Sequence, residues 1–523
     1  MPLLPKTAVL AGALLACGAA FGQNLAIGFA DPVSSLDPEL NNHAGDRSLA
    51  LHFWDSIIAA RDGGKLDATL AASWRALDDK TWEFKLKPDI KWQDGVPFTA
   101  DDIVFSFQRA RNVPGSVATY AGSLRTVEST TAKDAHTVII KTTTPNPMLP
   151  QDIASIYVVS KHIGEKSRTE DYNSGKAMIG TGPYKFVSYV PGDRTVMERS
   201  PTYWGPKAAW EKVTYRYIKN GAARTAALLA GDVDVIDKVA VTDVEKLRKT
   251  PSVSVYTYPG LRVLLLQPSF RPGPNEFITD NAGKPLAQNP LTDLRVRQAL
   301  STAINRKAII DRIMQGTATE ANQWMPKNTF GYNPEVKDIA YNPELAKKLL
   351  AEAGFPQGFQ ITIHVPGDRY PQAPETIQAI AQFWTRVGVK TQVQVVPWSM
   401  YSGRATKNEF AVSVIAWGNG TGEASYGLLQ TLASNDTKAG RGANNWGRYS
   451  NEAVDKALDA ATVEFDARRR EAILRHAVKL VTDDVGQIPI FHYQNIWAAK
   501  KGLKVVPLLS DRTTAMQVFK IGK

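Results

Sequence analysis

The chain has 523 residues, of which 43% are hydrophobic and 22% are charged, and this balance is typical of a folded protein with two or three domains. It excludes a disordered or collagen-like chain. The formal net charge of +11 would suit a nucleic acid, but the basic residues are scattered and their densest runs, at 468–470 and 500–501, are short. We therefore expect a basic surface exposed to solvent and no nucleic-acid partner.

The N-terminus is typical of a secretory signal. Lys6 precedes an apolar run at 7–20 that is too short to span a bilayer. Cleavage after residue 22 would release a soluble periplasmic protein that begins at Gln23, and we favour this outcome. The alternative is a lipid anchor at Cys17, which is the single cysteine of the chain, so no intrachain disulfide can form.

The first third of the chain predicts strands and then a helix. Residues 81–86 alternate apolar and polar side chains, and Asp94-Gly95 within 91–98 is typical of a hairpin turn. Thr99 followed by Asp101 and Asp102 is a capping-box variant, because a hydroxyl and acids at these positions satisfy the first N–H groups of a helix. We expect a short hairpin and then a helix through Ile103.

Residues 290–451 alternate helix and strand patterns. Asn342 and Pro343 predict the start of a helix that ends at Gly354, with Leu345, Leu349 and Leu350 as its buried stripe. Strands are predicted at 360–365, 390–396 and 411–417, and a helix at 375–387. This order predicts right-handed βαβ units in a largely parallel sheet, in which ligands bind beyond the carboxyl ends of the strands.

Two glycine-rich stretches do not fit a phosphate site. At 414–429 the glycines at 418, 420 and 422 are spaced by two, and Glu423 stands where a dinucleotide fingerprint needs its third glycine. At 179–184 Pro183 lacks the N–H that a phosphate would require. We read the second stretch as a tight turn that enters a strand.

Catalytic and metal-binding patterns are absent from the sequence. The seven histidines form no zinc-type pair, and no Gly-x-Ser-x-Gly elbow is found. The acidic pairs at 101–102 and 483–484 are better explained as helix caps and solvated faces than as acid–base dyads. We therefore expect a binding protein without catalytic residues, metal or cofactor.

An ordered set of short motifs covers nearly all of the chain after the signal. They are SLDP (35–38), LAASW (70–74), DKTWEFKL (79–86), KWQDG (91–95), FTADDIVFS (98–106), GTGPY (180–184), DLRVRQAL (293–300), AGFP (353–356), RYSN (448–451) and QIPI (487–490). In these motifs the chain resembles the extracellular solute-binding proteins of the dipeptide, oligopeptide and nickel type, which serve ABC importers.

The resemblance implies an α/β, two-lobed periplasmic binding protein fold with a hinge. The first lobe would contain 23–60, 180–265 and 490–523, with an inserted subdomain at 61–179. The second lobe would contain 266–489, and crossings near 265 and 490 would form the hinge. A monomer would close its lobes over a small molecule or short peptide and deliver it to the permease subunits.

The resemblance also implies ligand-binding residues. In dipeptide-binding relatives an Arg of the second lobe binds the peptide carboxylate, and an acid soon after a Trp binds the amino group. Arg369 aligns with that Arg and Trp417 with that Trp, but the acid position is Gly420. Either Glu423, with Asn419 nearby, replaces the acid, or the ligand carries no peptide-like ammonium there.

Further ligand contacts are expected from both lobes. Asn42, His43 and Asp46 occupy the first-lobe loop that contacts ligand in relatives, and Trp398 and Trp446 are candidate apolar walls, although each is also a candidate core residue. Short peptides are the first ligand expected, peptide-like or opine-like metabolites the second, and metal or haem chelates the third. An exported hydrolase and a chaperone-like binder of unfolded chains are the alternative functions.

Overall fold

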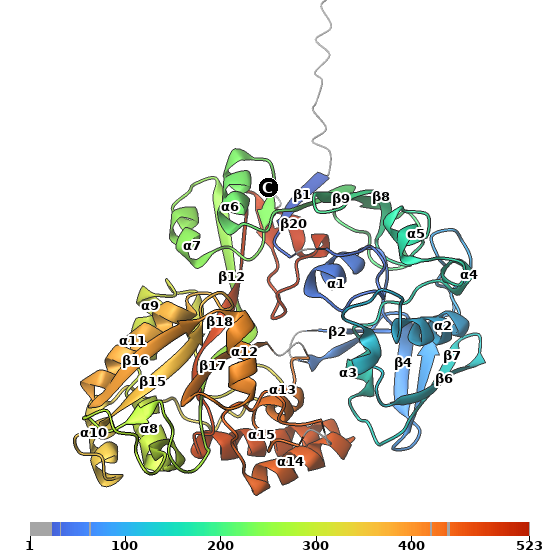
Figure 1. The fold of residues 1–523 in the computed structure, drawn as a ribbon. Helices are drawn as coiled ribbons and strands as arrows, with labels where there is room; N and C mark the ends of the chain where they lie inside the picture. The colour runs from blue at the N-terminus through green and yellow to red at the C-terminus, as the bar shows by residue number, and fades with distance from the viewer. Residues whose placement is uncertain (1–23, 32, 62–63, 419–420, 437–439, 522–523) are drawn as a thin grey trace, which may run out of the picture.

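The computed structural model describes residues 24–31, 33–61, 64–418, 421–436 and 440–521 (Figure 1). The predicted signal peptide with Cys17, the predicted site residue Asn419, and Gly420, which stands at the family's acid position, lie outside these ranges. Within the described ranges, none of the helices has the length and apolar character that a bilayer span requires.

One sheet of 12 strands runs through both lobes in the order β13-β15-β17-β12-β18-β11-β1-β10-β9-β8, and β14 and β16 pair with β18 and β15. Two long antiparallel strands, β12 (Val253–Pro268) and β18 (Ile488–Lys500), join the lobes (Figure 1). Their register shifts between Pro259 and Val263 and between Leu264 and Leu265. The predicted crossings near 265 and 490 fall in these strands, and motion there stays a prediction.

The first lobe is built on the β1 end of the large sheet. β1 pairs in parallel with β10 and β11, and β9 and β8 extend the sheet antiparallel. The strands and helices of this part are β1 (Asn24–Phe29), β8 (Tyr184–Val190), β9 (Arg194–Arg199), β10 (Lys212–Tyr217), β11 (Val235–Ile236), α1 (Ala44–Ala50), α6 (Gly221–Ala230), α7 (Val241–Arg248), β19 (Leu503–Val505) and β20 (Val518–Lys520).

A smaller antiparallel sheet, in the order β4-β5-β7-β6, lies within the first lobe. The predicted helix is α2 (Ala100–Ala110), and the N–H of Thr99 donates to the carboxylate of Asp102 at 2.9 Å, as a capping box requires. The hairpin at 91–98 is present as a single bridge between Lys91 and Pro97. The other elements here are β2 (Ile58–Ala60), β3 (Leu66–Ala68), β4 (Ala71–Ala76), β5 (Thr81–Leu86), β6 (Val127–Asp134), β7 (Thr137–Thr142), α3 (Leu149–Ile153), α4 (Lys161–Gly164) and α5 (Thr169–Asn173).

The second lobe contains the predicted βαβ units. β15 (Phe359–Pro366) pairs in parallel with β16 (Val389–Val396) and with β17 (Val412–Gly418). The three predicted strands are parallel to one another as expected, but the sheet as a whole is mixed, because β12, β13, β14 and β18 add antiparallel pairs. The remaining elements are β13 (Ile278–Thr279), β14 (Ala318–Glu320), α8 (Leu294–Thr302), α9 (Arg306–Arg312), α10 (Pro343–Glu352), α11 (Ala373–Arg386), α12 (Trp398–Thr406), α13 (Ala424–Thr431), α14 (Glu452–Val463) and α15 (Ala467–Asp483).

The helix predicted from Asn342 to Gly354 is confirmed as α10. The Asn342 side chain accepts from the N–H of Leu345, and Gly354 has a φ of +91°, which favours glycine. Its predicted buried stripe is only partly right: Leu350 is buried, Leu349 is half-buried and Leu345 is 42% exposed.

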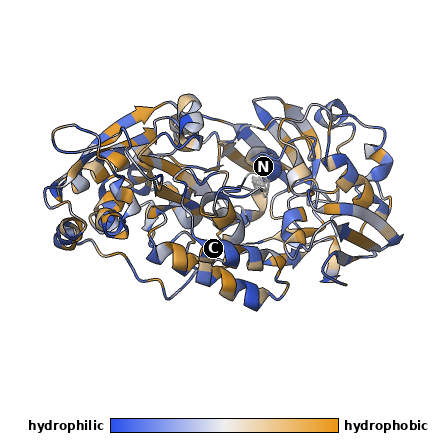
Figure 2. Cartoon of the chain, turned by 60° about the horizontal axis from the view of Figure 1, so that its bottom comes forward, coloured by the Kyte–Doolittle hydropathy of each residue, from blue (hydrophilic) through white to orange (hydrophobic). Residues whose placement is uncertain are grey.

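Separate hydrophobic cores support the two lobes. One core joins β1 and β10 to the smaller sheet, so the inserted subdomain shares its interior with the first lobe. Two others cover opposite faces of the second-lobe sheet, against α8 and α11 on one side and α13 to α15 on the other. Figure 2 shows hydrophobic and hydrophilic residues alternating along the outer helices, as helices that bury one face require.

Candidate functional site

The loop that follows β15 carries Arg369. Its guanidinium carbon lies 5.1 Å from the ring centroid of Trp398, in a cation–π contact. The N–H of Trp398 donates to the Asp368 carboxylate at 2.8 Å, which ties this loop to the start of α12. β15 and β16 are adjacent and parallel, so both segments leave the same edge of the sheet. Arg369 is exposed there, on an aromatic face.

An aromatic cluster holds Trp398 in place. Its ring stacks on Tyr401 at 6.0 Å between centroids, and the Trp446 ring is 6.3 Å away. The Tyr401 hydroxyl accepts from the N–H of Val414 at 2.6 Å, which fixes the cluster to β17. Trp398 is half-buried, whereas Trp446 is only 4% exposed. The geometry therefore leaves Trp398 accessible and places Trp446 in the core.

Trp417 lies near the end of β17. It pairs with Val263 of β12, and its ring lies 6.0 Å from that of Tyr426. It is half-buried, and its indole N–H has no hydrogen-bond partner among the described residues. It therefore lies where β17 meets a lobe-joining strand, and its contact with ligand stays a prediction.

Glu423 has a partner inside the protein. It is 1% exposed, its Oε2 lies 3.3 Å from Nη2 of Arg470, and the Ser425 hydroxyl donates to its Oε1 at 3.0 Å. Burial raises the pKa of the Glu423 carboxyl, against the attraction of Arg470. A buried carboxylate with its own cation is typical of a structural ion pair. Its predicted role toward a ligand ammonium stays untested, and the burial argues against that role.

The turn before α13 also touches the first lobe. Gly64 has a φ of +78°, and a side-chain carbon added there would lie 3.4 Å from the carbonyl oxygen of Gly422. Farther along, the Phe465 ring stacks on Trp82 at 6.0 Å between centroids. The lobes therefore meet at these two places as well as along β12 and β18.

The predicted first-lobe loop has one exposed member. Asp46 is 5% exposed and accepts from the N–H and the hydroxyl of Ser34 at 2.6 and 2.7 Å. Burial raises its pKa, and these hydrogen bonds oppose the rise. Asn42 is half-buried and donates its N–H to the Ala118 carbonyl at 2.7 Å. His43 is exposed, 3.5 Å from Asp46, at the start of α1. In Figure 1, α1 and α12 lie on the facing sides of the two lobes.

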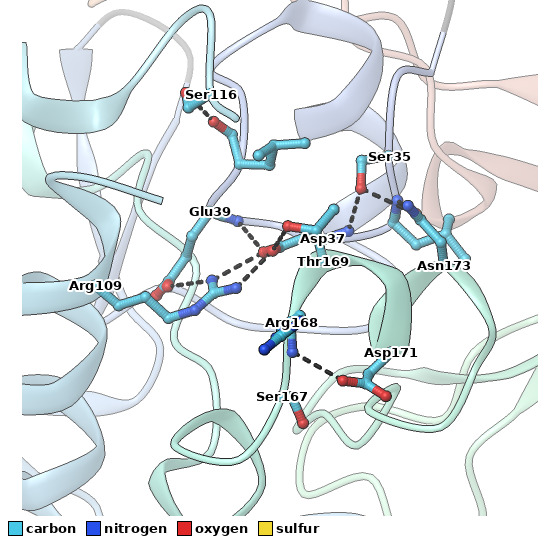
Figure 3. A network of polar contacts seen from close by, with 12 residues as sticks. Ser35, Asp37, Glu39, Arg109, Ser116, Ser167, Arg168, Thr169, Asp171 and Asn173 are labelled. Atoms are coloured by element: carbon cyan, nitrogen blue, oxygen red, sulfur yellow. Dashed lines mark hydrogen bonds and ion pairs between the residues drawn. The ribbon is translucent and has the colours of Figure 1, made fainter. Parts of the chain in front are cut away.

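A buried ionic network supports this loop (Figure 3). Arg109 of α2 donates to Asp37 at 2.5 and 2.9 Å and to Glu39 at 2.8 Å, and the Thr169 hydroxyl donates to Asp37 at 2.8 Å. Burial raises the pKa of the Glu39 carboxyl to about 8, against the attraction of Arg109. The loop after β1 is thus anchored to the inserted subdomain.

A second ionic cluster, which the sequence analysis missed, joins the first lobe to the lobe-joining strands. Lys238 Nζ lies 2.7 Å from Asp31 and 3.3 Å from Asp511. Burial alone would raise the pKa of the Asp511 carboxyl. The positive charges of Lys238 and Arg262 outweigh this effect and hold that pKa below its usual value. Arg262 of β12 also donates to the Ala416 carbonyl at 3.0 Å. Asp31 comes two residues after the end of β1, so the rule for strand ends could have found it.

The predicted site residues are only partly brought together. Arg369, Trp398 and Trp446 form one cluster, and Asn42, His43 and Asp46 form another in the first lobe. The Trp417 ring contacts Tyr426, and Glu423 pairs with Arg470. Within the described ranges, no group of three or more His, Cys, Asp or Glu side chains could hold a metal ion. The first cluster offers a planar cation on an aromatic face, an arrangement that can bind a carboxylate at two points.

The two lobes, their joining strands and loop residues at the strand ends define a solute-binding protein of the two-lobed type. The family model for bacterial extracellular solute-binding proteins, family 5 Middle, matches residues 65–439. The chain therefore belongs to family 5 of the bacterial extracellular solute-binding proteins. The resemblance and the fold class predicted from the sequence are confirmed.

Relatives match most of the chain. Heme-binding protein A of Haemophilus influenzae is 28% identical over 451 residues, covering 82% of this chain and 79% of its own length. The dipeptide-binding protein of Escherichia coli is 27% identical over 470 residues and 84% of each chain. The solved structure of HbpA2 from Haemophilus parasuis, 26% identical, has a TM-score of 0.82 over 95% of this chain and all (100%) of that one. The murein tripeptide-binding protein MppA in its unliganded open form, 25% identical, has a TM-score of 0.80 over 96% and 98%.

Proposed function

We propose that this protein captures a short peptide or peptide-like metabolite in the periplasm and delivers it to the permease subunits of an ABC importer, without changing it chemically. Membership in the solute-binding family supports this proposal, as do relatives named for binding dipeptides and murein peptides. The observation that carries the ligand class is the exposed Arg369 on the Trp398 ring.

We assign the carboxylate end of the ligand to Arg369. Within the described residues Arg369 forms no ion pair with an acid, so its charge is available to an anion. The planar guanidinium can donate two parallel hydrogen bonds to a carboxylate. Trp398 supplies an apolar surface beside it. Because Glu423 already faces Arg470, we assign no ammonium partner to the second lobe.

Closure of the lobes would select the ligand. We assign 23–60, 180–265 and 490–523 to the first lobe, 61–179 to its inserted subdomain and 266–489 to the second lobe, with the hinge in β12 and β18. A ligand favours closure only through contacts that exist in the closed form. Arg369 and Trp398 from one lobe and His43 from the other are the side chains that we expect to make them.

Thermal unfolding with matched ligands tests this function. Short peptides with a free C-terminal carboxylate should raise the melting temperature, since a ligand that binds only the folded form stabilises it. The same peptides with a carboxamide C-terminus should have little effect. Native mass spectrometry of protein purified without refolding should show a ligand mass that is lost on denaturation. Equal binding of both peptide forms, or cleavage of a peptide on long incubation, would contradict the proposal.

The proposed location needs its own test. We infer that the mature protein is a soluble periplasmic monomer that begins at Gln23. N-terminal sequencing of the periplasmic fraction should read from Gln23, and size-exclusion chromatography with light scattering should give the mass of one chain. A lipid-bearing N-terminus at Cys17, abolished in the Cys17→Ala variant, would show instead that the protein is anchored.

A further inference from the structure

A cavity of about 410 Å³ lies in the second lobe, among α8, α10, α15 and the joining strands. This volume is typical of a small-molecule site. Its wall contains Leu265 of β12 and Pro489 of β18, which are paired in the sheet, and none of the residues around it is charged. Arg369, Trp398 and the first-lobe loop take no part in its wall. The cavity is therefore distinct from the proposed solute site.

The wall of this cavity contains two unsatisfied polar groups. Trp324 and Gln487 both line it and are 4% and 7% exposed. The indole N–H of Trp324 and the side-chain oxygen of Gln487 have no hydrogen-bond partner among the described residues. The amide nitrogen of Gln487 donates to the Thr431 carbonyl at 2.8 Å, which leaves its oxygen as the free end. Buried polar groups are usually paired, and a molecule in the cavity would supply partners for this donor and this acceptor.

Apolar side chains also remain open at the cavity. Leu345 and Leu349 of α10 belong to the stripe that the sequence predicts to be buried, yet Leu345 is 42% exposed, and both line the cavity. Val485, also in the wall, has a φ of +47°, a conformation that strains a β-branched residue and that glycine would adopt freely. This conformation belongs to the C-terminal cap of α15, where the N–H of Gly486 donates to the Val481 carbonyl at 2.9 Å. Leu345 and Leu349 are therefore the open side chains that a ligand would cover.

We propose that this cavity is a second binding site, for a neutral and mainly aliphatic small molecule that carries a hydroxyl or carboxamide group. The polar group would accept a hydrogen bond from Trp324 and donate one to Gln487. The aliphatic part would lie against Leu345, Leu349 and Val485. A carboxylate or an ammonium does not fit, because the wall has no opposite charge to compensate it.

Titration of the mature protein with octanol and octanoate tests the site. Octanol should bind with one site per chain, as measured by ligand-observed NMR. Octanoate, which has the same chain length but a charge, should bind at least about tenfold more weakly. The Leu349→Trp variant fills the cavity and should abolish octanol binding, whereas Arg369→Ala should leave it unchanged.

A second variant makes a smaller change in the cavity wall, and it tests the same site if Leu349→Trp impairs folding. Trp324→Phe removes the indole N–H donor together with part of the ring, and should weaken octanol binding by roughly fivefold to tenfold. It should weaken the binding of octane, which lacks the hydroxyl, clearly less. Octanoate binding as tight as octanol, or octanol binding that survives both Leu349→Trp and Trp324→Phe, would overturn the proposal. Because Arg369 is outside the cavity, failure here leaves the proposed peptide binding intact, and the reverse also holds.

Discussion

The turn at Glu423 and the loop at Arg369 follow neighbouring strands of the same sheet, and the sequence marks both residues as charged ligand contacts. Their surroundings differ. Glu423 is 1% exposed and faces Arg470, whereas Arg369 is exposed and stacks on Trp398. A position at a strand end therefore does not make a charged side chain available to a ligand. The availability of the charge depends on whether a partner of opposite charge lies nearby in the fold, because a buried charge must be compensated.

The largest effect is expected from Glu423→Ala. The variant leaves Arg470 buried without its carboxylate, and we expect the free energy of unfolding to fall by about 3–5 kcal/mol, measured by urea denaturation. Replacing both partners with apolar residues, as in Glu423→Leu with Arg470→Met, should restore much of this loss. If Glu423→Ala has normal stability but loses ligand binding, Glu423 contacts the ligand and is not an internal ion-pair partner, and the contrast with Arg369 is wrong.

Arg369→Ala should affect binding and leave the fold intact. We expect the affinity for a carboxylate ligand to fall by about 2–4 kcal/mol, because the bound carboxylate loses its charge partner. The stability should change by less than about 0.5 kcal/mol, as for other exposed positions. Isothermal titration calorimetry measures the first quantity. Arg386, which lies over the Phe383 ring at 5.7 Å, is a matched control, and Arg386→Ala should bind normally.

Asp55 offers a third case, because it is half-buried and its carboxyl forms no ion pair within the described residues. It accepts from the Trp204 indole at 3.0 Å and the Thr181 hydroxyl at 2.9 Å, and burial raises its pKa to about 6. A raised carboxyl pKa means that the folded state binds the proton more tightly, so this stability is present below about pH 4 and lost as the pH rises to about 6.

The Asp55→Asn variant tests this pH-dependent loss of stability. The amide keeps an acceptor for both hydrogen bonds but does not ionise. Relative to the unchanged protein, the variant should gain about 2 kcal/mol of stability between pH 4 and pH 7, measured by denaturation at each pH. A difference that does not vary with pH would show that Asp55 titrates normally and that burial there has little cost.

The smallest effect is expected from Trp398→Leu. Leucine keeps an apolar surface but removes the ring face under Arg369, so ligand affinity should fall by about 1 kcal/mol. This loss should be clearly smaller than that of Arg369→Ala in the same calorimetric assay. If the two losses are equal, the ring itself binds the ligand, and the stacked pair acts as one contact.

Local patterns predicted single elements well. Helix α10 was predicted from Asn342, Pro343 and Gly354, because caps and a positive φ depend on residues close in sequence. The mixed character of the sheet was missed, because β12 and β18 pair across more than two hundred residues. Leu345 matches a buried stripe by its spacing but lines a cavity, since spacing cannot show whether anything packs against a helix face.

The sequence by itself determined the family, single elements such as α10 and β15, and several of the residues that stand at strand ends. These follow from short motifs and hydrophobic periodicity, which are properties of neighbouring residues. Only the tertiary structure decided that Glu423 faces Arg470, 47 positions away, and that Lys238 reaches Asp31, 207 positions away. Partners of this kind are selected by how the elements pack, and no spacing rule along the chain encodes them.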